Sequence, residues 1–280
     1  LLVSSRKIYE GINWTQNLTK DGTVAKQVEK GKKAFVGQEI FGKTLGIVGL
    51  GAIGKLVANA VLALGMKVIA YDPFVTSTDL AIELTNNVND VYAKSDYITL
   101  HVPATEQTKN SINKNTIALM KDGVRIINLA RGELVNNEDI KQAIADKKVA
   151  KYVTDLPSDD ILGVDGIITI PHLGASTAEA EDNCAVMAAN QLKDYLENGN
   201  VVNSVNFPKL QVERGGKQRI CVVSSSADAV AKISSSLKDV CNIASATRGS
   251  ICYVIADVNT AVDANTLNAI KAGSVSVRVL

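Results

Sequence analysis

Short apolar runs alternate with helix-like segments through the first two thirds of this chain, and this alternation is what most restricts the possible folds. The runs are rich in β-branched residues and lack strict polar alternation, which is typical of strands buried on both faces. The strand-like runs are TLGIVGL (44–50), KVIAYD (67–72), YITLHV (97–102), RIINLA (125–130), KYVTDL (151–156) and GIITIP (166–171). The helix-like segments include AIGKLVANAVLALG, INKNTIALMKDG and NNEDIKQAIADKK. This order predicts an α/β fold with a doubly wound parallel sheet.

The composition of the sequence changes after Asn206. The segment FPKLQVERGGKQ (207–218) is rich in Pro, Gly and charged residues, which is typical of a linker. Residues 219–280 then give the order strand, helix, strand, strand, helix, strand. That order is the ferredoxin-like split βαβ pattern, so we expect a second, small α+β domain at the C-terminal end.

The charge balance argues against several classes of partner. The chain holds 30 Lys plus Arg against 29 Asp plus Glu, so no strong field attracts nucleic acid or an anionic membrane surface. The opening LLVSSRKIYEGINW is too polar for a signal peptide, and no run reaches the roughly 20 apolar residues that a membrane-spanning helix needs. We therefore expect a cytoplasmic protein with no nucleic-acid or membrane partner.

The four cysteines, Cys184, Cys221, Cys241 and Cys252, have no CxxC spacing and no second histidine near them. Metal-binding cysteines and disulfide frameworks are recognised by such recurring spacings. We therefore expect no metal site and interpret all four as reduced packing residues.

The segment VGLGAIG (48–54) carries the clearest binding motif. Gly49, Gly51 and Gly54 follow a predicted strand and open a predicted helix, the context in which G-x-G-x-x-G indicates a dinucleotide site. The helix N-terminus would face the pyrophosphate. Asp72 ends the next strand 21 positions after Gly51, where it would accept hydrogen bonds from the adenosine ribose and repel a 2′-phosphate. The motif predicts NAD rather than NADP; the alternative is a glycine-rich turn that binds nothing.

Polar side chains gather where the predicted strands end. In a doubly wound sheet, ligands bind beyond the carboxyl ends of the strands. Hydride transfer between a nicotinamide and a 2-hydroxy acid needs a base, a cation for the carboxylate and a group that fixes the tautomer of the base. The strand ends supply His101-Val102-Pro103, Leu129-Ala130-Arg131, Asp155 and Pro171-His172. Plainer interpretations stay open: Arg131 as a surface residue closing a β–α turn, and His101 as a wall residue on the adenine side.

Several of these segments closely resemble the NAD-dependent D-2-hydroxyacid dehydrogenases. The similar motifs are GLGAIGKLVANA, ALGMKVIAYDP, SDYITLHVPAT, MKDGVRIINLARGELVN, YVTDLPSDDILG and IPHLGASTAEAEDNCAVMAANQL, in that order along the chain. The resemblance is strong as far as Pro208 and weaker after it. Within the family the chain looks most like members that oxidise 3-phosphoglycerate and carry a C-terminal ACT domain. The resemblance implies NAD as the cofactor and assembly as a homodimer or homotetramer.

The resemblance also implies roles for single residues. Arg131, in the A-R-G motif, would bind the substrate carboxylate and carbonyl, and His172, in the P-H-x-G motif, would take the hydroxyl proton. Asp155 would reach the nicotinamide. The family's Glu that hydrogen-bonds the histidine corresponds here to Asp160, one methylene shorter, with Asp159 as a neighbour that could substitute; a solvated acidic turn is the alternative. The remaining cofactor contacts would come from Ala52, Ile53, His101, Val102, Pro103, Leu129, Ala130, Leu173, Gly174 and Ala175.

Family members begin with a substrate domain that has little counterpart here. The resemblance implies that residues 1–14 and 173–206 are remnants of that domain, flanking a Rossmann-type NAD-binding domain at 15–172. The second remnant opens with S-T-A-E, which predicts a capping box at Ser176 and Glu179. We therefore expect part of a longer protein that binds NAD but turns substrate over poorly.

Residues 219–280 are similar to ACT modules, which bind serine as a feedback inhibitor. Asn242 matches a ligand position of such modules, whereas the stretch SSSADA (224–229) lacks their usual Gly or Pro bend. Two interpretations stay open for this ACT-like domain: a regulatory site for L-serine, or a dimerisation module without a ligand.

The resemblance implies NAD-dependent oxidation of 3-phosphoglycerate to 3-phosphohydroxypyruvate, the first step toward serine. Reduction of another 2-oxo acid, such as hydroxypyruvate or glyoxylate, is one alternative. The other is a binding protein that senses NADH and contacts partners, and the shortened acid at Asp160 would fit that role.

Overall fold

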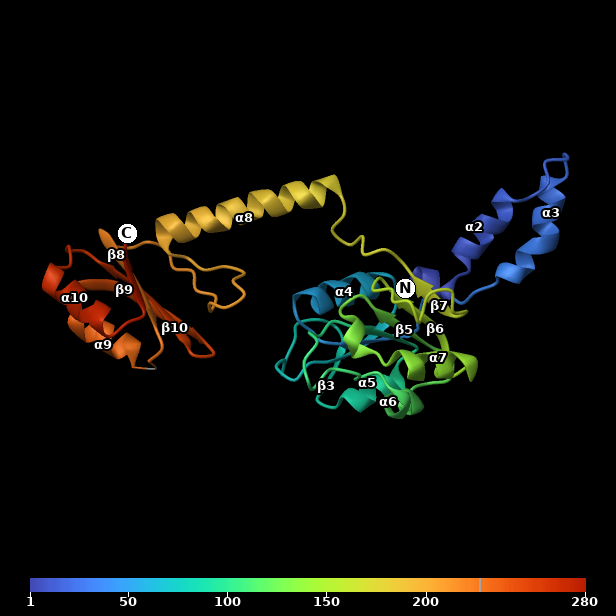
Figure 1. Cartoon of the computed structure of the whole chain (residues 1–280), viewed down its shortest axis with the longest axis horizontal. Coiled ribbons are helices and arrows are strands. Elements are labelled where there is room, and N and C mark those ends of the chain that lie inside the picture. The colour runs from blue at the N-terminus through green and yellow to red at the C-terminus, as the bar shows by residue number, and fades with distance from the viewer. Residues whose placement is uncertain (227) are drawn as a thin grey trace. The chain divides into compact units, whose positions relative to one another are not determined.

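The computed structural model describes residues 1–226 and 228–280, so Ala227 of the SSSADA stretch lies outside the described residues. The chain divides into two compact units, Leu1–Gly174 and Ala175–Leu280 (Figure 1). Each unit holds its own sheet and its own hydrophobic clusters. Among the described residues, no helix is both long enough and apolar enough to cross a membrane.

A seven-stranded sheet forms the centre of the first unit. Every pair of neighbouring strands is parallel, in the order β3-β2-β1-β4-β5-β6-β7. The order reverses direction between β1 and β4, which is the arrangement of a doubly wound sheet and confirms the predicted fold class. The strands are β1 (Thr44–Val48), β2 (Lys67–Tyr71), β3 (Glu83–Thr85), β4 (Tyr97–Leu100), β5 (Val124–Asn128), β6 (Val149–Thr154) and β7 (Ile167–Thr169).

Helices cover both faces of this sheet (Figure 1). On one face Ile47 of β1 belongs to a buried cluster with Ala58 of α4. On the other face Ile98 of β4 lies in a second cluster with Ile117 of α6 and Ile140 of α7. The helices are α4 (Ala52–Ala63), α5 (Val88–Lys94), α6 (Lys114–Leu119) and α7 (Asn137–Ala145), with the short 3₁₀ helix η2 (Gly132–Leu134) before α7. A sheet buried on both faces explains why its strands read as continuous apolar runs.

The sequence pattern does not predict α5 or β3. β3 spans three residues and α5 spans seven, too few for a hydrophobic period to stand out. α5 begins where the side chain of Asn87 accepts a hydrogen bond from the backbone N–H of Asn89 at 3.1 Å. A local cap of this kind starts the helix without a long amphipathic stretch.

The chain begins with a helical arm, which Figure 1 shows projecting from the rest of the first unit. Trp14 stacks on Phe35 with ring centroids 5.1 Å apart, which holds the two halves of the arm together. Gly31 lies so close to the Trp14 ring that a Cβ would overlap it. At the base of the arm, Nε of Arg125 donates to the carbonyl oxygen of Ser4 at 2.8 Å. The arm comprises α1 (Leu2–Ser5), α2 (Ile8–Gln16), α3 (Val24–Gly31) and η1 (Lys32–Phe35).

Four antiparallel strands form the sheet of the second unit, in the order β11-β8-β10-β9. The chain order is strand, helix, strand, strand, helix, strand, so the predicted ferredoxin-like pattern is confirmed. Ile233 of α9 and Ile270 of α10 pack in one cluster with Val222 and Val254 of the sheet. The elements are β8 (Gln218–Ser224), α9 (Ala229–Ser236), β9 (Val240–Arg248), β10 (Ile251–Val258), α10 (Ala264–Ala272) and β11 (Ser276–Val279).

A separate apolar cluster is built on Cys221 and Tyr253 of the same sheet. The segment predicted as a linker contributes to it, because Phe207 and Leu210 pack against these side chains. Leu210 also exchanges backbone hydrogen bonds with Val201 at 2.8 and 3.1 Å. Part of the segment that precedes β8 in the chain is therefore packed into the second unit. The apolar residues of this segment are separated by Pro, Gly and charged residues, so no hydrophobic pattern predicts their packing.

Helix α8 (Ala178–Asn198) belongs to the second unit. Its N-cap is Thr177, whose Oγ1 accepts the N–H of Ala180 at 3.1 Å, so the predicted cap at Ser176 is wrong by one residue. Ser and Thr are both favoured at the N-cap, so the pair S-T does not determine which of the two residues caps the helix. The helix ends at Gly199 with φ 72°, the left-handed conformation that glycine adopts readily.

The proposed grouping of residues 1–14 and 173–206 into one domain remnant stays a prediction. The first segment lies in the first unit, and all but the first two residues of the second segment lie in the second unit. Each is described here only within its own unit.

A buried ion pair ties the end of α8 to the second sheet. Arg219 and Asp257 have fully buried side chains, joined by hydrogen bonds from Nε to Oδ1 at 2.6 Å and from Nη2 to Oδ2 at 2.7 Å. Nη1 of Arg219 also donates to the carbonyl oxygen of Asn198 at 2.7 Å, and Nη2 of Arg278 donates to that of Leu196 at 3.0 Å. Burial alone would raise the pKa of Asp257, but the hydrogen bonds and charge of Arg219 hold it below its ordinary value.

The cysteines divide into two pairs. Cys221 and Cys252 are buried, as predicted for packing residues. Cys184 on α8 and Cys241 on the edge strand β9 are exposed, so the packing prediction is wrong for these two. Residues 181–190 of α8 are all exposed and β9 is an edge strand, which a cysteine count does not reveal.

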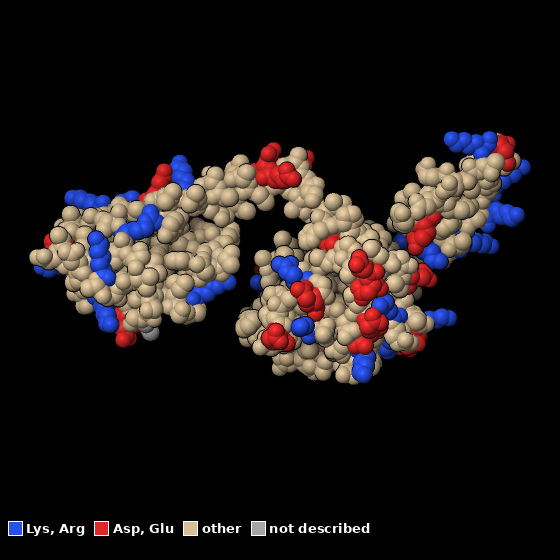
Figure 2. All heavy atoms as spheres, viewed as in Figure 1, with Lys and Arg blue, Asp and Glu red and all other residues tan. Residues whose placement is uncertain are grey.

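Charged side chains of both signs are interspersed around the first sheet (Figure 2). On the face drawn in Figure 2, acidic and basic side chains alternate over the part of the first unit that holds the sheet. Mixed charges of this kind produce no extended field of one sign.

Candidate functional site

The loop between β1 and α4 carries the three glycines of the predicted motif. Gly49 has φ 97°, and a Cβ there would lie 2.5 Å from the carbonyl oxygen of His101. A Cβ on Gly54 would run into the carbonyl oxygen of Gly49. The fold itself therefore requires these two glycines, because they let strand, loop and helix pack closely.

Gly51 differs from its two neighbours. It caps α4 with φ −74° and ψ −159°, and no atom lies within 4 Å of where its Cβ would stand. The fold leaves this position open to a side chain, whereas a phosphate approaching the backbone N–H groups of a helix N-terminus needs the space free. Ala52 and Ile53 follow, exposed on the first turn of α4. Gly51 thus leaves open space at the N-terminus of α4 that a Cβ would fill; we call this space the Gly51 cradle.

Asp72 stands directly after β2, beside the glycine loop. Its Oδ2 accepts the N–H of Leu50 at 2.8 Å, and its Oδ1 accepts that of Phe74 at 2.9 Å. Each carboxylate oxygen has a further lone pair to offer, and the residue is only half-buried. The carboxylate is therefore fixed beside the loop, where it can accept hydrogen bonds from ribose hydroxyls.

The backbone of His101, the residue after β4, lies against the glycine loop. The backbone N–H of His101 donates to the carbonyl oxygen of Val48 at 2.8 Å, and its Nε2 lies 3.1 Å from Oγ1 of Thr99. Burial lowers the pKa of His101, which favours the neutral ring. Val102 packs against the core and Pro103 is exposed. A neutral, half-buried ring suits the wall of a site.

The end of β5 presents Leu129, Ala130 and Arg131. Asn128, which no motif identifies, shapes this turn: its Nδ2 donates to the carbonyl oxygen of Arg131 at 2.8 Å, and its Oδ1 accepts the N–H of Ala130 at 3.2 Å. The exposed side chain of Arg131 donates from Nη1 to the carbonyl oxygen of Ala130 at 2.6 Å. Its other N–H groups make no hydrogen bond within the described residues. The one sequence signal for Asn128 was a lone amide in the apolar run RIINLA.

A buried carboxylate follows β6. Asp155 is 7% exposed, and its Oδ1 has no hydrogen-bond partner among the described residues. Buried polar atoms in folded proteins nearly always have a partner, so a lone acceptor at the end of a parallel strand indicates a donor on a ligand. The carboxamide of a nicotinamide supplies such N–H donors.

Asp160 lies in a network of its own. Its Oδ1 accepts hydrogen bonds from Oγ of Ser158 at 2.6 Å and from Nδ2 of Asn137 at 3.2 Å, and its Oδ2 lies 3.7 Å from Nζ of Lys141. The bond from Ser158, above all, lowers the pKa of this exposed carboxyl group. The network ties the turn after β6 to α7.

His172 follows β7 and is exposed, as are Leu173 and Gly174. In the described part of the chain, no hydrogen bond joins His172 to Asp160 or Asp159. The structure thus does not bring together the predicted base and its predicted orienting acid. Ala175 begins the second unit, and its assignment to the cofactor wall stays a prediction.

The strand order explains which groups share an edge. Because β2, β1, β4, β5, β6 and β7 are neighbours and all parallel, their carboxyl ends meet at one edge of the sheet. Asp72, His101, Arg131, Asp155 and His172 each follow one of these strands. The Gly51 cradle, the fixed Asp72 carboxylate and the lone oxygen of Asp155 fit the pyrophosphate, the ribose and the nicotinamide of NAD in turn.

Comparison with known families identifies the first unit. A protein-family model, described as D-isomer specific 2-hydroxyacid dehydrogenase, NAD binding domain, matches residues 1–174. The match ends where the first compact unit ends.

Curated relatives extend the likeness to full-length proteins. D-3-phosphoglycerate dehydrogenase of Methanocaldococcus jannaschii is 36% identical over 211 residues, covering 72% of this chain and 40% of that protein. Hydroxypyruvate reductase of Thermotoga maritima is 45% identical over 159 residues, covering 54% of this chain and 52% of that protein. The chain therefore spans about half the length of these relatives, or less.

Solved structures agree on the fold. D-2-hydroxyisocaproate dehydrogenase is 29% identical with a TM-score of 0.57, covering 64% of this chain and 62% of that one. D-lactate dehydrogenase from Escherichia coli is 24% identical with a TM-score of 0.60, covering 72% of this chain and 63% of that one. At this identity the likeness shows the fold alone. With more than half of the chain matched, the protein belongs to the D-isomer specific 2-hydroxyacid dehydrogenase family, and its first unit is the NAD-binding domain of that family.

Proposed function

We propose that the protein containing this chain oxidises 3-phosphoglycerate to 3-phosphohydroxypyruvate with NAD, as a phosphoglycerate dehydrogenase. The observation that carries the proposal is the carboxyl edge of the first sheet. There Gly51, Asp72 with its fixed carboxylate and Asp155 with its lone oxygen each follow one of the parallel strands, as do Arg131 and His172. One edge thus supplies both a dinucleotide site and the groups that handle a 2-hydroxy acid.

Each side chain has a defined task in the oxidation. Arg131 binds the substrate carboxylate, because its planar guanidinium matches two carboxylate oxygens. His172 takes the hydroxyl proton as the O–H bond breaks and the carbonyl forms at C2, and returns that proton in the reverse reaction. The bound nicotinamide supplies the acceptor for the hydride that leaves C2. Asp155 accepts an N–H of the carboxamide and so orients the ring.

The orienting acid is assigned to Asp160, with Asp159 as the alternative. Asp160 has to give up part of its network with Ser158 and Asn137 to reach the imidazole of His172. The carboxylate would hold the imidazole in the orientation that takes the hydroxyl proton, so its loss should lower kcat for oxidation more than it changes KM. We expect that loss in Asp160→Asn; the same loss in Asp159→Asn alone would assign the role to Asp159.

The substrate assignment rests on relatives and on the second unit. D-3-phosphoglycerate dehydrogenases are 36% and 38% identical over about seven tenths of the chain. The βαββαβ second unit supports the same assignment, because the resemblance implies an ACT domain in that branch of the family. Hydroxypyruvate reduction is the second candidate, favoured by the higher identity of 45% over a shorter stretch.

The second unit is proposed to act as an ACT-like domain. Asn242, the position similar to an ACT ligand residue, lies half-buried on the edge strand β9. L-Serine binding and assembly into a homodimer or homotetramer are the two candidate roles. Inhibition of the whole protein by millimolar L-serine, lost in Asn242→Ala, would support regulation, whereas no inhibition leaves assembly.

The decisive experiment compares substrates and variants of the whole protein. NADH oxidation is followed with 3-phosphohydroxypyruvate, hydroxypyruvate and glyoxylate, and we expect the highest kcat/KM for the first. His172→Ala should lower kcat by about 10²–10⁴-fold, the usual worth of a general acid–base group. His101→Asn is the comparison variant: since that ring is assigned to the wall of the NAD site, KM for NADH can change with it, whereas kcat should stay close to that of the parent. Equal rates for His172→Ala and the parent would contradict the assigned base, and NADH binding without turnover of any substrate would indicate a sensor.

A further inference from the structure

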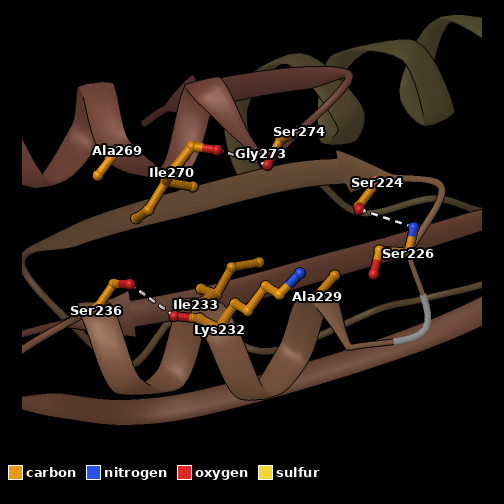
Figure 3. A pocket seen from close by; sticks show the side chains of 10 residues that line it. All are labelled: Ser224, Ser226, Ala229, Lys232, Ile233, Ser236, Ala269, Ile270, Gly273 and Ser274. Carbon is orange, nitrogen blue, oxygen red and sulfur yellow. Dashed lines mark hydrogen bonds between the residues drawn. The ribbon is translucent and has the colours of Figure 1, made fainter.

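A small cavity lies between α9 and α10 of the second unit (Figure 3). Its volume of about 70 Å³ leaves room for a ligand of a few heavy atoms. The buried side chains of Ile233 and Ile270 line it, and Ser224 from the end of β8 lies at one end of it, near Ser226 and Ser274 (Figure 3). No step of the proposed dehydrogenase reaction uses this cavity.

Two hydroxyl groups in the cavity have a proton to donate. Ser224 is 3% exposed, and its Oγ accepts the N–H of Ser226 at 3.1 Å. Oγ of Ser226 in turn accepts the N–H of Asp228 at 3.3 Å. Both hydroxyls act as acceptors in these bonds, and neither hydroxyl proton has an acceptor among the described residues. Ser224 and Ser226 are therefore free to donate to a ligand.

Two other hydroxyl groups have already donated their protons. Oγ of Ser236 donates to the carbonyl oxygen of Lys232, and Oγ of Ser274 donates to that of Ile270, both at 2.7 Å (Figure 3). A hydroxyl that has donated its proton offers only lone pairs to a third group. Ser236 and Ser274 therefore present only hydrogen-bond acceptors, so a ligand that binds to them must donate a proton of its own.

The charge at the cavity is positive. Lys232 is the only charged side chain that lines it, and no carboxylate lines it. Among the described residues Lys232 forms no ion pair, and Figure 3 shows its side chain extending along α9 toward Ala229 and Ser226. One ammonium beside donor hydroxyls favours an anion.

We propose that this cavity binds a phosphate group that retains one proton, either the free ion or the end of a phosphomonoester. Lys232 offsets the charge, Ser224 and Ser226 donate to two phosphate oxygens, and Ser274 accepts from the P–O–H. Sulfate at neutral pH has no proton to give, and a planar carboxylate has too few oxygens for this set of partners. The proposal is independent of the dehydrogenase assignment.

Titration of the full chain with inorganic phosphate tests the site. Binding is measured by calorimetry at constant ionic strength with saturating NAD present, so that the glycine loop of the first unit is occupied. We expect one saturable site that methyl phosphate shares if the cavity accepts esters and that sulfate does not fill. Binding to phosphate but not to methyl phosphate assigns the site to the free ion. No saturable binding of either compound, or equal binding of sulfate, would overturn the proposal.

Variants link binding to the cavity. Lys232→Met keeps the length of the exposed side chain and removes the charge, and we expect affinity to fall about tenfold or more. Ser224→Ala should weaken binding in the same direction, with its melting curve measured to verify the fold. Lys271→Met is the control, because Lys271 lies on α10 but does not line the cavity. Equal losses in the Lys232 and Lys271 variants would contradict the site.

Discussion

The two sheets of this protein use charged side chains in opposite ways. At the edge of the parallel sheet, Asp155 is buried with one oxygen unpartnered among the described residues. Within the antiparallel sheet, Arg219 and Asp257 are more completely buried, but they satisfy each other and the end of α8. Burial of a charge alone therefore does not mark a functional site; the hydrogen bonds that are left over do.

Removing one partner of the buried pair should have the largest effect. Asp257→Ala leaves the Arg219 guanidinium buried without its carboxylate, which costs about 3–5 kcal/mol in the free energy of unfolding of the second unit. Urea denaturation followed by circular dichroism measures the loss. Glu213→Ala, at an exposed acid in the same unit, should change stability by less than about 0.5 kcal/mol. Comparable stability of the two variants would show that the pair is not a structural tie.

Two glycines of one loop should separate stability from binding. Gly49→Ala places a Cβ at φ 97° against the carbonyl oxygen of His101, so we expect a loss of roughly 1–3 kcal/mol in stability of the first unit. Gly51→Ala meets no atom and should keep that stability, while its methyl group fills the cradle and lowers NAD affinity. Thermal melting and NAD titration of both variants test the contrast. Unchanged NAD affinity in Gly51→Ala would contradict the cradle.

A smaller change is expected at the ribose side. Asp72→Asn keeps the shape of the side chain but removes the charge, so NAD binding should weaken by about 1–1.5 kcal/mol. Repulsion of a 2′-phosphate disappears at the same time, and the ratio of NADP to NAD affinity should rise. Titration with both dinucleotides measures the ratio, and an unchanged ratio would remove Asp72 from the ribose site.

The pH dependence of the first unit should show the smallest effect. Burial lowers the pKa of His101 in the fold, so the unfolded chain binds the proton more readily. The contribution of neutral His101 to the free energy of unfolding is fully present above a pH of about 6.5, the pKa of histidine in the unfolded chain. It is lost as pH falls below that value, by at most about 1.4 kcal/mol per pH unit. Calorimetry of the parent and His101→Asn measures this slope. Equal slopes would place the responsible group elsewhere.

The arrangement of the first sheet could be predicted because its signals are local. Apolar runs are followed by glycine, acid, arginine or histidine at the strand ends, and parallel pairing brings those ends to one edge. Asn128 was not predicted, because it acts by hydrogen-bonding to the backbone of a turn, and no sequence motif marks that role. Asp160 was placed by spacing, but its partners Ser158 and Asn137 come from a turn and a helix whose packing the spacing does not encode.

The second unit shows the opposite case. Its order of elements follows from the sequence, whereas its buried ion pair joins Arg219 to Asp257 across two adjacent strands. Arg219 opens a strand after a charged, glycine-rich segment and there resembles a solvated end residue. Only the register of β8 against β10 brings it to its carboxylate, and register between antiparallel strands depends on tertiary packing.

The stacked pair in the arm gives the protein a built-in optical reporter. Trp14 is the only tryptophan of the chain, and it lies half-buried against Phe35 within the first unit. Its fluorescence therefore comes entirely from one of the two units and from a point distant in sequence from every strand-end residue. Unfolding of the arm can be followed by emission while the second unit, which contains tyrosine but no tryptophan, stays dark at the same wavelength.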